Sequence, residues 1–382
     1  MSKHLFLIGK NLRRNTRRTV LTILSSAISV FLIGSLLSVY GMLYEREVAE
    51  ESALRLITRH KVSLTQTLPY YYLERIASVD GVGRVMPMNW FGGTYIDERP
   101  ENMFARFAVD PELVFDIFSE FSVPPEQLEA FKRDRQGLAV GRSIADKLGF
   151  SLGQRITIKG DIYPFDPEFT IRAIFEGQDD QQVFFHFKYL EESLDEEWGT
   201  QVGTFTVRLQ SEDYATQVAR EIDDMFRNAP EPTQTETEAA FQLSFISQLG
   251  NVKLFLLSIA GAIVFTMLLV SANTVAMSVR ERTREIGVLK TLGFPSRSVL
   301  GLVLGEAVVI AVAGAVVGVA LTFAVNAAMA GVSVQFMSGF TLPDWGVAVC
   351  FAMALVIGLG SSAVPAAVAA RTKIVDALRH TG

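Results

Sequence analysis

Hydrophobic residues are concentrated in four long stretches of the chain. The runs 19–44, 254–279, 307–343 and 345–370 contain no Asp, Glu, Lys or Arg. An α-helix rises about 1.5 Å per residue, so about 20 residues cross the hydrocarbon core of a bilayer. Each run is long enough to cross once, and 307–343 is too short for two full spans and a turn. Four buried helices of a large soluble core would rarely all be this long without a charge, so we predict four transmembrane helices.

The charges outside these runs predict how the chain crosses the membrane. Segments 1–18, 280–298 and 371–382 hold 14 Lys/Arg against 3 Asp/Glu, whereas 45–250 holds 20 Lys/Arg against 36 Asp/Glu. Basic residues in short loops stay in the cytoplasm, and long segments translocate largely regardless of charge. Both termini are therefore expected in the cytoplasm and 45–250 outside. The first run is longer than the core of a cleavable signal peptide, so we expect a retained anchor.

The long segment between the first two spans is predicted to fold as an α+β domain. The expected strands are 61–67, 84–96, 102–109, 168–175 and 203–209, and the expected helices are 69–78, 111–118, 124–133 and 212–227. Residues 137–160 read as strand, helix, turn and strand, with Gly149 as a helix C-cap and Ser211 as an N-cap further on. For 230–238 we favour, over a flexible link, a helical stalk that starts near residue 236 and continues into the second span. Cys350, the one cysteine, lies in the last run, so no disulfide is expected in this domain.

The sequence shows no set of residues typical of a catalytic site. No G-x-x-x-x-G-K-[ST] pattern occurs, so the chain has no P-loop of its own. For His60 and His186 a structural or solvated role is favoured, and the acidic run 191–198 is more typical of a solvated helix face than of a metal site. Glu306 lies about one turn inside the third span, and a helix-pairing or interfacial role is favoured over a proton path. We expect no catalytic residue, metal or cofactor on this chain, and no nucleic-acid partner.

A charged segment, RERTREIGVLKTLGFPS at 280–296, separates the second and third spans. It is charged at its start and apolar later, as an amphipathic helix would be, with Ile286, Leu289 and Leu292 at i, i+3 and i+6 and Val288 beside them. Gly293 is expected to end this helix and Pro295 to begin the next one. A solvated hairpin that obeys the positive-inside rule is the simplest interpretation. Two glutamates and an apolar side exceed what orientation requires, so docking onto another protein is favoured.

Small residues recur at four-residue spacing in the last two spans. Such rows let helices approach closely in lipid, which supports tight bundle packing or dimerisation. The predicted helix-packing residues are Gly301, Gly305, Gly314, Gly318 and Gly358.

Several of these stretches together resemble one protein family. The pattern EIGVLKTLG at 285–293 resembles the signature of FtsX-like ABC transporter permeases of the MacB type. Further stretches similar to this family are NLRRNTRRTVLT (11–22), GRSIADKLGFSLGQRITI (141–158), GEAVVIAVAGAVVG (305–318), PAAVAAR (365–371) and DALR (376–379).

The resemblance implies the membrane subunit of an ATP-driven complex. ATP and Mg²⁺ would bind a separate ABC ATP-binding subunit, beneath two permease copies that are identical or paralogous, and a periplasmic adaptor protein is a further expected partner. Hydrolysis would move the domain outside the membrane and so export or extract a substrate. This sequence contains no ATPase domain, so the ATPase is expected on another chain. The expected ATPase-contact residues are Glu281, Arg284, Glu285, Gly287, Lys290 and Gly293.

On this interpretation the chain is a multi-pass protein of a bacterial plasma membrane, organised in nine segments. These are a cytoplasmic amphipathic N-terminal helix (1–18), transmembrane helices (19–44, 251–279, 299–326, 345–370), an extracytoplasmic MacB-like domain with its stalk (45–250), a cytoplasmic coupling helix (280–298), an external loop (327–344) and a cytoplasmic tail (371–382). Two alternatives stay open: a non-transporting transducer of the same family that regulates a cell-wall enzyme or a sensor kinase, and a membrane-anchored scaffold that needs no ATPase.

Overall fold

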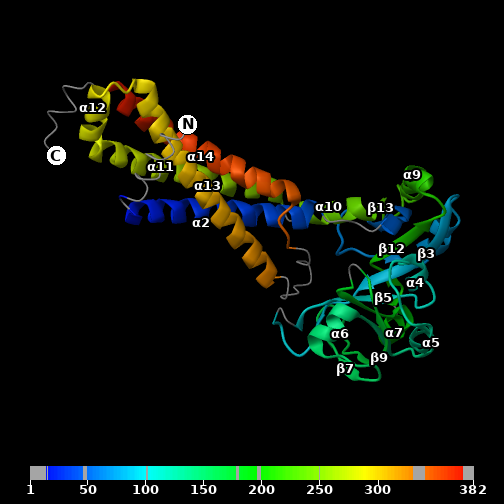
Figure 1. The fold of residues 1–382 in the computed structure, drawn as a ribbon. Helices are drawn as coiled ribbons and strands as arrows, with labels where there is room; N and C mark the ends of the chain where they lie inside the picture. Colours follow the sequence, from blue (N-terminus) through cyan, green and yellow to red (C-terminus); the bar gives the residue numbers. More distant parts are fainter. Residues whose placement is uncertain are drawn as a thin grey trace. The chain divides into compact units, whose positions relative to one another are not determined.

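The computed structural model describes residues 14, 16–45, 50–99, 102–177, 180–195, 199–248, 250–329 and 340–372. The chain divides into two compact units, a helix bundle and a domain inserted between the first and second helices of that bundle (Figure 1). Each unit is built around its own core.

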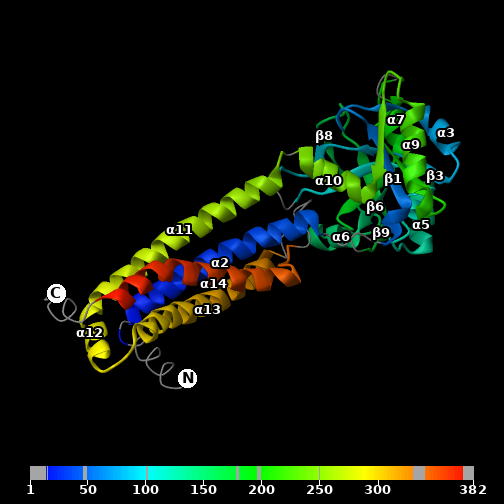
Figure 2. The ribbon, with the colours of Figure 1, turned by 90° about the horizontal axis from the view of Figure 1, so that it is seen from above.

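Among the described residues, four helices are long and apolar enough to cross a membrane: α2 (Thr16–Tyr44), α11 (Val252–Glu281), α13 (Ser296–Met329) and α14 (Asp344–Arg371). Helix α13 packs along α2 and α14, and α11 packs along α14 and α2 (Figure 2). In the bundle core, the Asn326 amide of α13 donates to the Ser38 hydroxyl of α2 at 3.0 Å.

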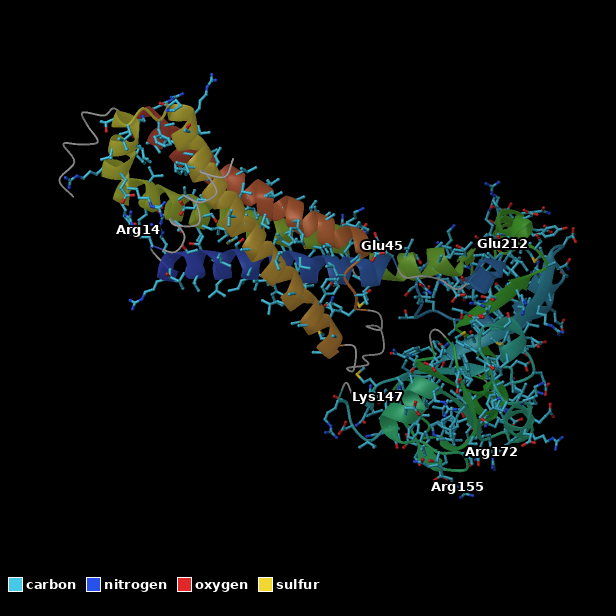
Figure 3. All side chains as sticks on the ribbon, in the orientation of Figure 1. Arg14, Glu45, Lys147, Arg155, Arg172 and Glu212 are labelled. Atoms are coloured by element: carbon cyan, nitrogen blue, oxygen red, sulfur yellow. The ribbon has the colours of Figure 1, made fainter. Side chains whose placement is uncertain are left out.

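The two ends of α2 are marked by Arg14 and Glu45, which lie far apart along the bundle (Figure 3). At the Glu45 end, the indole N–H of Trp345 donates to the carboxylate at 2.9 Å. This contact joins α2 to the first turn of α14. The predicted architecture, four apolar helices with a folded domain between the first two, is confirmed.

The inserted domain is organised around one mixed sheet of nine strands. In their order across the sheet these are β13 (Thr233–Thr237), β1 (Arg55–His60), β12 (Thr204–Leu209), β3 (Val82–Trp90), β5 (Ala105–Val109), β10 (Gln182–His186), β6 (Gly137–Gly141), β9 (Glu168–Phe175) and β7 (Arg155–Thr157). The pairs β5–β10 and β6–β9 are parallel, and the other neighbours are antiparallel. Two short ribbons accompany the sheet, β2 (Leu68–Pro69) with β11 (Gln201–Val202) and β4 (Gly93–Thr94) with β8 (Lys159–Gly160).

Helices cover both faces of this sheet and enclose two hydrophobic cores. The helices over the first core are α3 (Tyr72–Ala77), α6 (Arg142–Leu148), α7 (Phe187–Ser193) and α9 (Ala215–Met225), and those over the second are α4 (Val114–Ile117) and α5 (Pro125–Arg133). Side chains alternate between the two faces along each strand. In β5, Ala108 therefore joins the first core and Val109 the second.

The strand predicted at 61–67 is wrong, because the strand precedes it as β1. All six residues of β1 are buried, so the alternation that marks a half-exposed strand is missing. Arg55 of β1 is only 1% exposed, yet its guanidinium pairs with Glu120 at 2.6 Å and with Glu238 at 2.7 Å. These two carboxylates make the buried charge tolerable.

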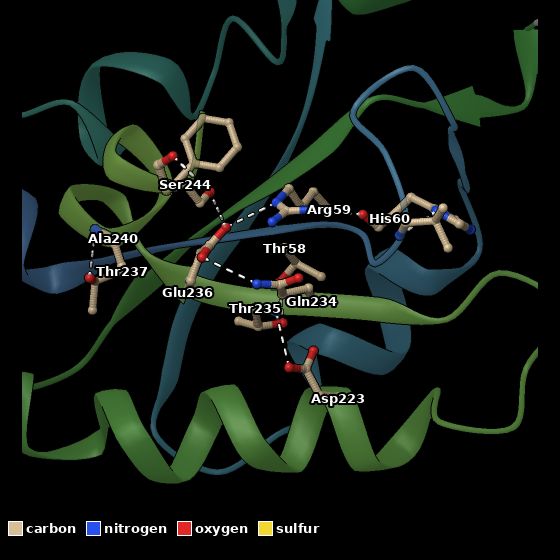
Figure 4. A network of polar contacts seen from close by, with 12 residues as sticks. Thr58, Arg59, His60, Asp223, Gln234, Thr235, Glu236, Thr237, Ala240 and Ser244 are labelled. Atoms are coloured by element: carbon tan, nitrogen blue, oxygen red, sulfur yellow. Dashed lines mark hydrogen bonds and ion pairs between the residues drawn. The ribbon is translucent and has the colours of Figure 1, made fainter. Parts of the chain in front are cut away.

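The flexible link considered for 230–238 is wrong, because residues 233–237 form the edge strand β13. Polar contacts hold β13 against β1 (Figure 4): Arg59 pairs with Glu236 at 2.9 Å, and Thr58 and Thr235 share a hydrogen bond of 3.0 Å. The helix expected from near residue 236 begins at Glu238, as α10 (Glu238–Gln248). It does not continue unbroken into the second span, since Gly250 adopts φ +96° before α11 starts.

Other local predictions hold. Strand β9 has the predicted bounds 168–175, and α5 matches 124–133 closely. Gly149 ends α6 in a left-handed conformation with φ +68°, and the Ser211 hydroxyl caps the short helix Glu212–Tyr214 by accepting from the Asp213 N–H. Strand β10 was not predicted, because it lies in the middle of the sheet and its apolar residues VFF are buried on both faces.

Candidate coupling site at one end of the helix bundle

The segment between the second and third spans contains a short helix of its own, α12 (Thr283–Thr291). Helix α11 ends at Glu281, and Arg282 leaves helical geometry with ψ 8°. At the other end Gly293 adopts φ +92° with nothing around it within 4 Å, so the glycine is required for its backbone conformation rather than for space. The predicted helix end at Gly293 is confirmed, and α13 begins at Ser296.

Two glutamates of this segment pair with arginines of α2. The Nη1 of Arg18 donates to Oε2 of Glu281 at 2.7 Å, and Arg14 pairs with Glu285. The two carboxylates remain 46% and 42% exposed, so each pair contributes at most about 1 kcal/mol. The pairs therefore orient α12 against α2 more than they stabilise it.

A more buried ion pair connects the same segment to α13. The two Nη atoms of Arg282 donate to the two carboxylate oxygens of Glu306 at 2.7 and 3.3 Å, and the side chains are 14% and 13% exposed. Breaking such a pair leaves an uncompensated charge in a poorly solvated place. The helix-pairing role expected for Glu306 is confirmed.

Lys290 connects α12 to the last span. Its ammonium group donates to the main-chain carbonyls of Ala370 and Thr372 at 2.8 and 2.6 Å. These are terminal carbonyls of α14, where a cation also interacts favourably with the helix dipole. Together with the arginine pairs, this contact ties α12 to α2, α13 and α14.

The inner side of α12 is apolar. Ile286 is 7% exposed and packs with Val299 and Ala369, and Gly287 is also buried. A cavity of about 110 Å³ lies between α2, α11, α12 and α13, with Ile286 and Arg282 in its wall. The short helix therefore packs against the end of the bundle through its apolar side.

The opposite side of α12 is exposed. Arg284, Val288 and Leu292 stand at i, i+4 and i+8, so they share one side of the helix. Val288 is 45% exposed and Leu292 is 72% exposed. We call these three residues the outer face of α12. It combines one cation with two large apolar side chains and has no ion pair within the described part of the chain.

Two models of known protein families match this chain. The model of the MacB-like periplasmic core domain matches residues 19–225, more than half of the chain, and the model of the FtsX-like permease C-terminal domain matches residues 257–374. The chain belongs to the FtsX/MacB family of ABC transporter permeases. The family implies an ATP-binding partner subunit, where ATPase activity resides.

One curated relative and two solved structures are similar to parts of this chain. An uncharacterized ABC transporter permease of Methanocaldococcus jannaschii is 24% identical over 322 residues, which cover 78% of this chain and 77% of the relative. The periplasmic region of MacB from Actinobacillus actinomycetemcomitans matches with 8% identity and a TM-score of 0.38, covering 53% of this chain and 97% of that one. The extracellular domain of the noncanonic ABC-type transporter YknZ from Gram-positive bacteria matches with 14% identity and a TM-score of 0.36, covering 48% and 99%.

The residues predicted to contact the ATPase of this permease divide into three groups. Glu281, Glu285 and Lys290 direct their side chains to other helices of the same chain, Gly287 and Gly293 shape α12, and Arg284 lies on the outer face. Contact of these residues with an ATPase stays a prediction. Val288 and Leu292 were expected on the apolar side of this helix but not among the ATPase contacts. Ile286, expected on the same side, packs inward on the bundle instead.

The predicted packing glycines also differ in their surroundings. A Cβ on Gly314 would lie 2.5 Å from Ser26 Oγ of α2, one on Gly318 would lie 2.6 Å from the Ala27 carbonyl of α2, and one on Gly358 would lie 2.8 Å from Ala311 Cβ of α13. Gly305 is half-buried, whereas Gly301 has nothing within 4 Å. A further close approach, not predicted, is that of Gly34 to Thr322.

The histidines and acidic residues of the inserted domain have structural partners. His186 Nε2 lies 2.7 Å from the Phe131 carbonyl, and His60 lies 3.1 Å from Glu231. In the acidic run Glu192 of α7 pairs with Arg135, and residues 196–198 lie outside the described residues. Within the described ranges, no three His, Cys, Asp or Glu side chains gather as metal ligands would.

Proposed function

We propose that this permease transmits ATP hydrolysis by a separate ABC ATPase to its inserted domain, which acts on a substrate to be exported or extracted at the outer surface of the membrane. Both termini and α12 lie in the cytoplasm on this proposal, as the basic short segments suggest. The observation that supports it best is the outer face of α12, an exposed surface on a helix tied to three spans.

The contacts of α12 provide a mechanical route. A displacement of this helix acts on the start of α2 through the Arg14–Glu285 pair, on α13 through Arg282 and on α14 through Lys290. No chemical step is required of the permease itself, because its part is to change shape. A partner that fits the outer face has an apolar depression for Leu292 and an acidic group for Arg284.

The chain connections suggest where that motion enters the inserted domain. Helix α2 leads toward β1, and β13 leads through α10 toward α11. The two strands are antiparallel neighbours joined by the Arg59–Glu236 pair. Moving α2 relative to α11 would therefore apply force to the strand pair β1–β13, and the Arg59–Glu236 ion pair opposes separation of these strands.

The test measures whether the ATPase stays bound to the permease. The permease is purified in mild detergent from its native membrane as wild type and as Leu292→Glu, which places a charge in the proposed apolar contact. Val62→Glu is the matched control, because Val62 of the inserted domain is 75% exposed and Leu292 is 72% exposed. We expect at least a tenfold loss of co-purifying ATPase, about 1.4 kcal/mol or more, in Leu292→Glu alone.

The opposite result would be equally clear. Stoichiometric ATPase in the Leu292→Glu preparation would remove the outer face from the contact. If the wild-type permease retained no ATPase while other ABC complexes stayed whole in the same detergent, the coupling proposal itself would fail and a scaffold role would be favoured.

A further inference from the structure

The inserted domain contains a charged residue at a core position. Strand β5 lies in the middle of the sheet between β3 and β10, and Arg106 is its second residue. Alternation places Arg106 on the same face as Phe104 and Ala108, which belong to the first hydrophobic core. Arg106 is only 4% exposed. A guanidinium group thus occupies a position whose neighbours on the same face are apolar core residues.

Among the described residues this guanidinium has no hydrogen-bond or carboxylate partner, and the Phe104 ring is its one cation–π contact. Its Nε is fully enclosed without an acceptor, and no described carboxylate lies within 4.0 Å of its nitrogens. Burial lowers the pKa of Arg106 to about 10, and the field of Asp161 opposes this shift only in part. Arg55 provides the contrast, because it is equally buried but pairs with two carboxylates. A buried guanidinium without a carboxylate partner is costly, so its presence at a core position needs an explanation.

The surroundings of Arg106 are aromatic. Its guanidinium carbon lies 4.4 Å from the centre of the Phe104 ring, and the Phe104 ring lies 6.0 Å from that of Tyr95. The main-chain carbonyl of Arg106 accepts a hydrogen bond from Phe91, whose ring stacks on Tyr163 at 5.7 Å. A cation held over a ring keeps its in-plane N–H donors free for another acceptor.

The loop that leads into this strand is strained. Ile96, next to Tyr95, adopts φ +63° although it is β-branched, and its side chain is 73% exposed. The following turn is held by Asp97, which accepts hydrogen bonds from the Arg99 main chain at 3.1 Å and from the Asn102 amide at 2.6 Å. Strained backbone of this kind gathers at ligand-binding sites, where surrounding contacts maintain it.

We propose that Arg106 is the anion-binding group of a ligand site in the inserted domain, and that it takes a carboxylate or phosphate group carried next to an apolar moiety. The planar guanidinium fork matches both oxyanions, and the partly exposed ring of Tyr95 suits the apolar part. Asp161 weakens the site by repelling the anion. This inference does not depend on the proposed coupling to an ATPase.

The test uses the full-length protein in lipid nanodiscs. The melting temperature Tm of the inserted domain is followed while chloride is replaced by acetate or by inorganic phosphate at constant ionic strength, up to about 50 mM, well above the millimolar Kd expected of one charged contact. We expect a saturable rise in Tm for the wild type, no rise for Arg106→Met, and a several-fold lower apparent Kd for Asp161→Asn. A response to acetate indicates a carboxylate ligand, and a response to phosphate alone indicates a phosphate ligand.

A second measurement separates a ligand site from a structural role. Without added oxyanion, Arg106→Met is expected to raise Tm by about 2 °C or more, because an apolar side chain of similar length replaces an unpaired charge. The matched variant Arg55→Met is expected to lower Tm, since it removes the arginine that pairs with Glu120 and Glu238. A loss of Tm in Arg106→Met like that in Arg55→Met would overturn the proposal. So would an equal anion response in wild type and Arg106→Met, or no response in the wild type.

Discussion

Gly318 provides the sharpest test of how the bundle is packed. A Cβ at this position would lie 2.6 Å from the Ala27 carbonyl oxygen, 2.7 Å from Val30 Cβ and 3.0 Å from the Phe31 nitrogen. Two of these three atoms belong to the backbone of α2, so no side-chain rotation can make room. The substitution Gly318→Ala must move α13 away from α2.

The size of the effect follows from these distances. Ordinary van der Waals contact begins near 3.4 Å, so the carbonyl contact requires about 0.8 Å of separation. A gap of that size forfeits a quarter to a half of the dispersion energy of the atoms that face it. Overpacked cores typically lose 1–3 kcal/mol, and we expect Gly318→Ala to lower the unfolding free energy of the bundle by about 2 kcal/mol.

The same helix supplies the control. Gly301 of α13 has nothing within 4 Å, so Gly301→Ala adds the same methyl group without a clash. Both substitutions gain the helix propensity of alanine, up to about 1 kcal/mol, and this gain cancels when the two variants are compared. The assay is equilibrium unfolding in mixed micelles with increasing SDS, followed by helical circular dichroism. Equal stability of the two variants would refute the packing inferred for Gly318.

Two further predictions concern buried titratable groups. Glu306→Gln is expected to lower the unfolding free energy of the bundle by about 3 kcal/mol in the same assay, because Arg282 stays buried without its partner, whereas the double variant Arg282→Met/Glu306→Met recovers most of that loss. Acidification from pH 7 to about pH 5 is expected to lower the Tm of the inserted domain in part through His186, because burial lowers the pKa of this histidine below its ordinary value and the unfolded chain takes up the proton first.

The outcomes that contradict these two predictions are specific. A double variant no more stable than Glu306→Gln would mean that the pair contributes through more than its mutual charge. For His186, the stability present at neutral pH is lost as the pH falls through the unfolded pKa toward the lower folded one. The variant His186→Gln can still donate to the Phe131 carbonyl but does not titrate. An undiminished pH dependence in that variant would assign the effect to other groups.

The spans could be predicted because the membrane imposes its own sequence rule. A run of 26 uncharged residues such as 19–44 has no equally simple explanation in water, and the rule needs no knowledge of the neighbouring helices. Gly149, Ser211 and Gly293 were predictable for a similar reason. Each acts within one turn of its own position, through a left-handed backbone or a local hydrogen bond.

Strands β1, β10 and β13 could not be predicted in this way, because their conformation depends on contacts with residues far along the chain. Arg55 in a buried strand is compatible with folding only because Glu120 and Glu238 approach it, which no local pattern reveals. Strand β10 is buried on both faces and lacks alternation. Strand β13 is polar because it is an edge strand, and Thr235 uses its main-chain N–H and its hydroxyl to contact Asp223 and Thr58.

The sequence analysis did not predict that the charged side chains around α12 pair with arginines near the start of the first span. Glu281 and Glu285 are four residues apart, and so are Arg14 and Arg18. The pairs found are Arg18 of α2 with Glu281, the last residue of α11, and Arg14, just before α2, with Glu285 of α12. Counting basic residues for membrane orientation treats these arginines as interchangeable. Their four-residue spacing matches that of the two glutamates, and the two pairs leave Arg284 on the exposed side of α12.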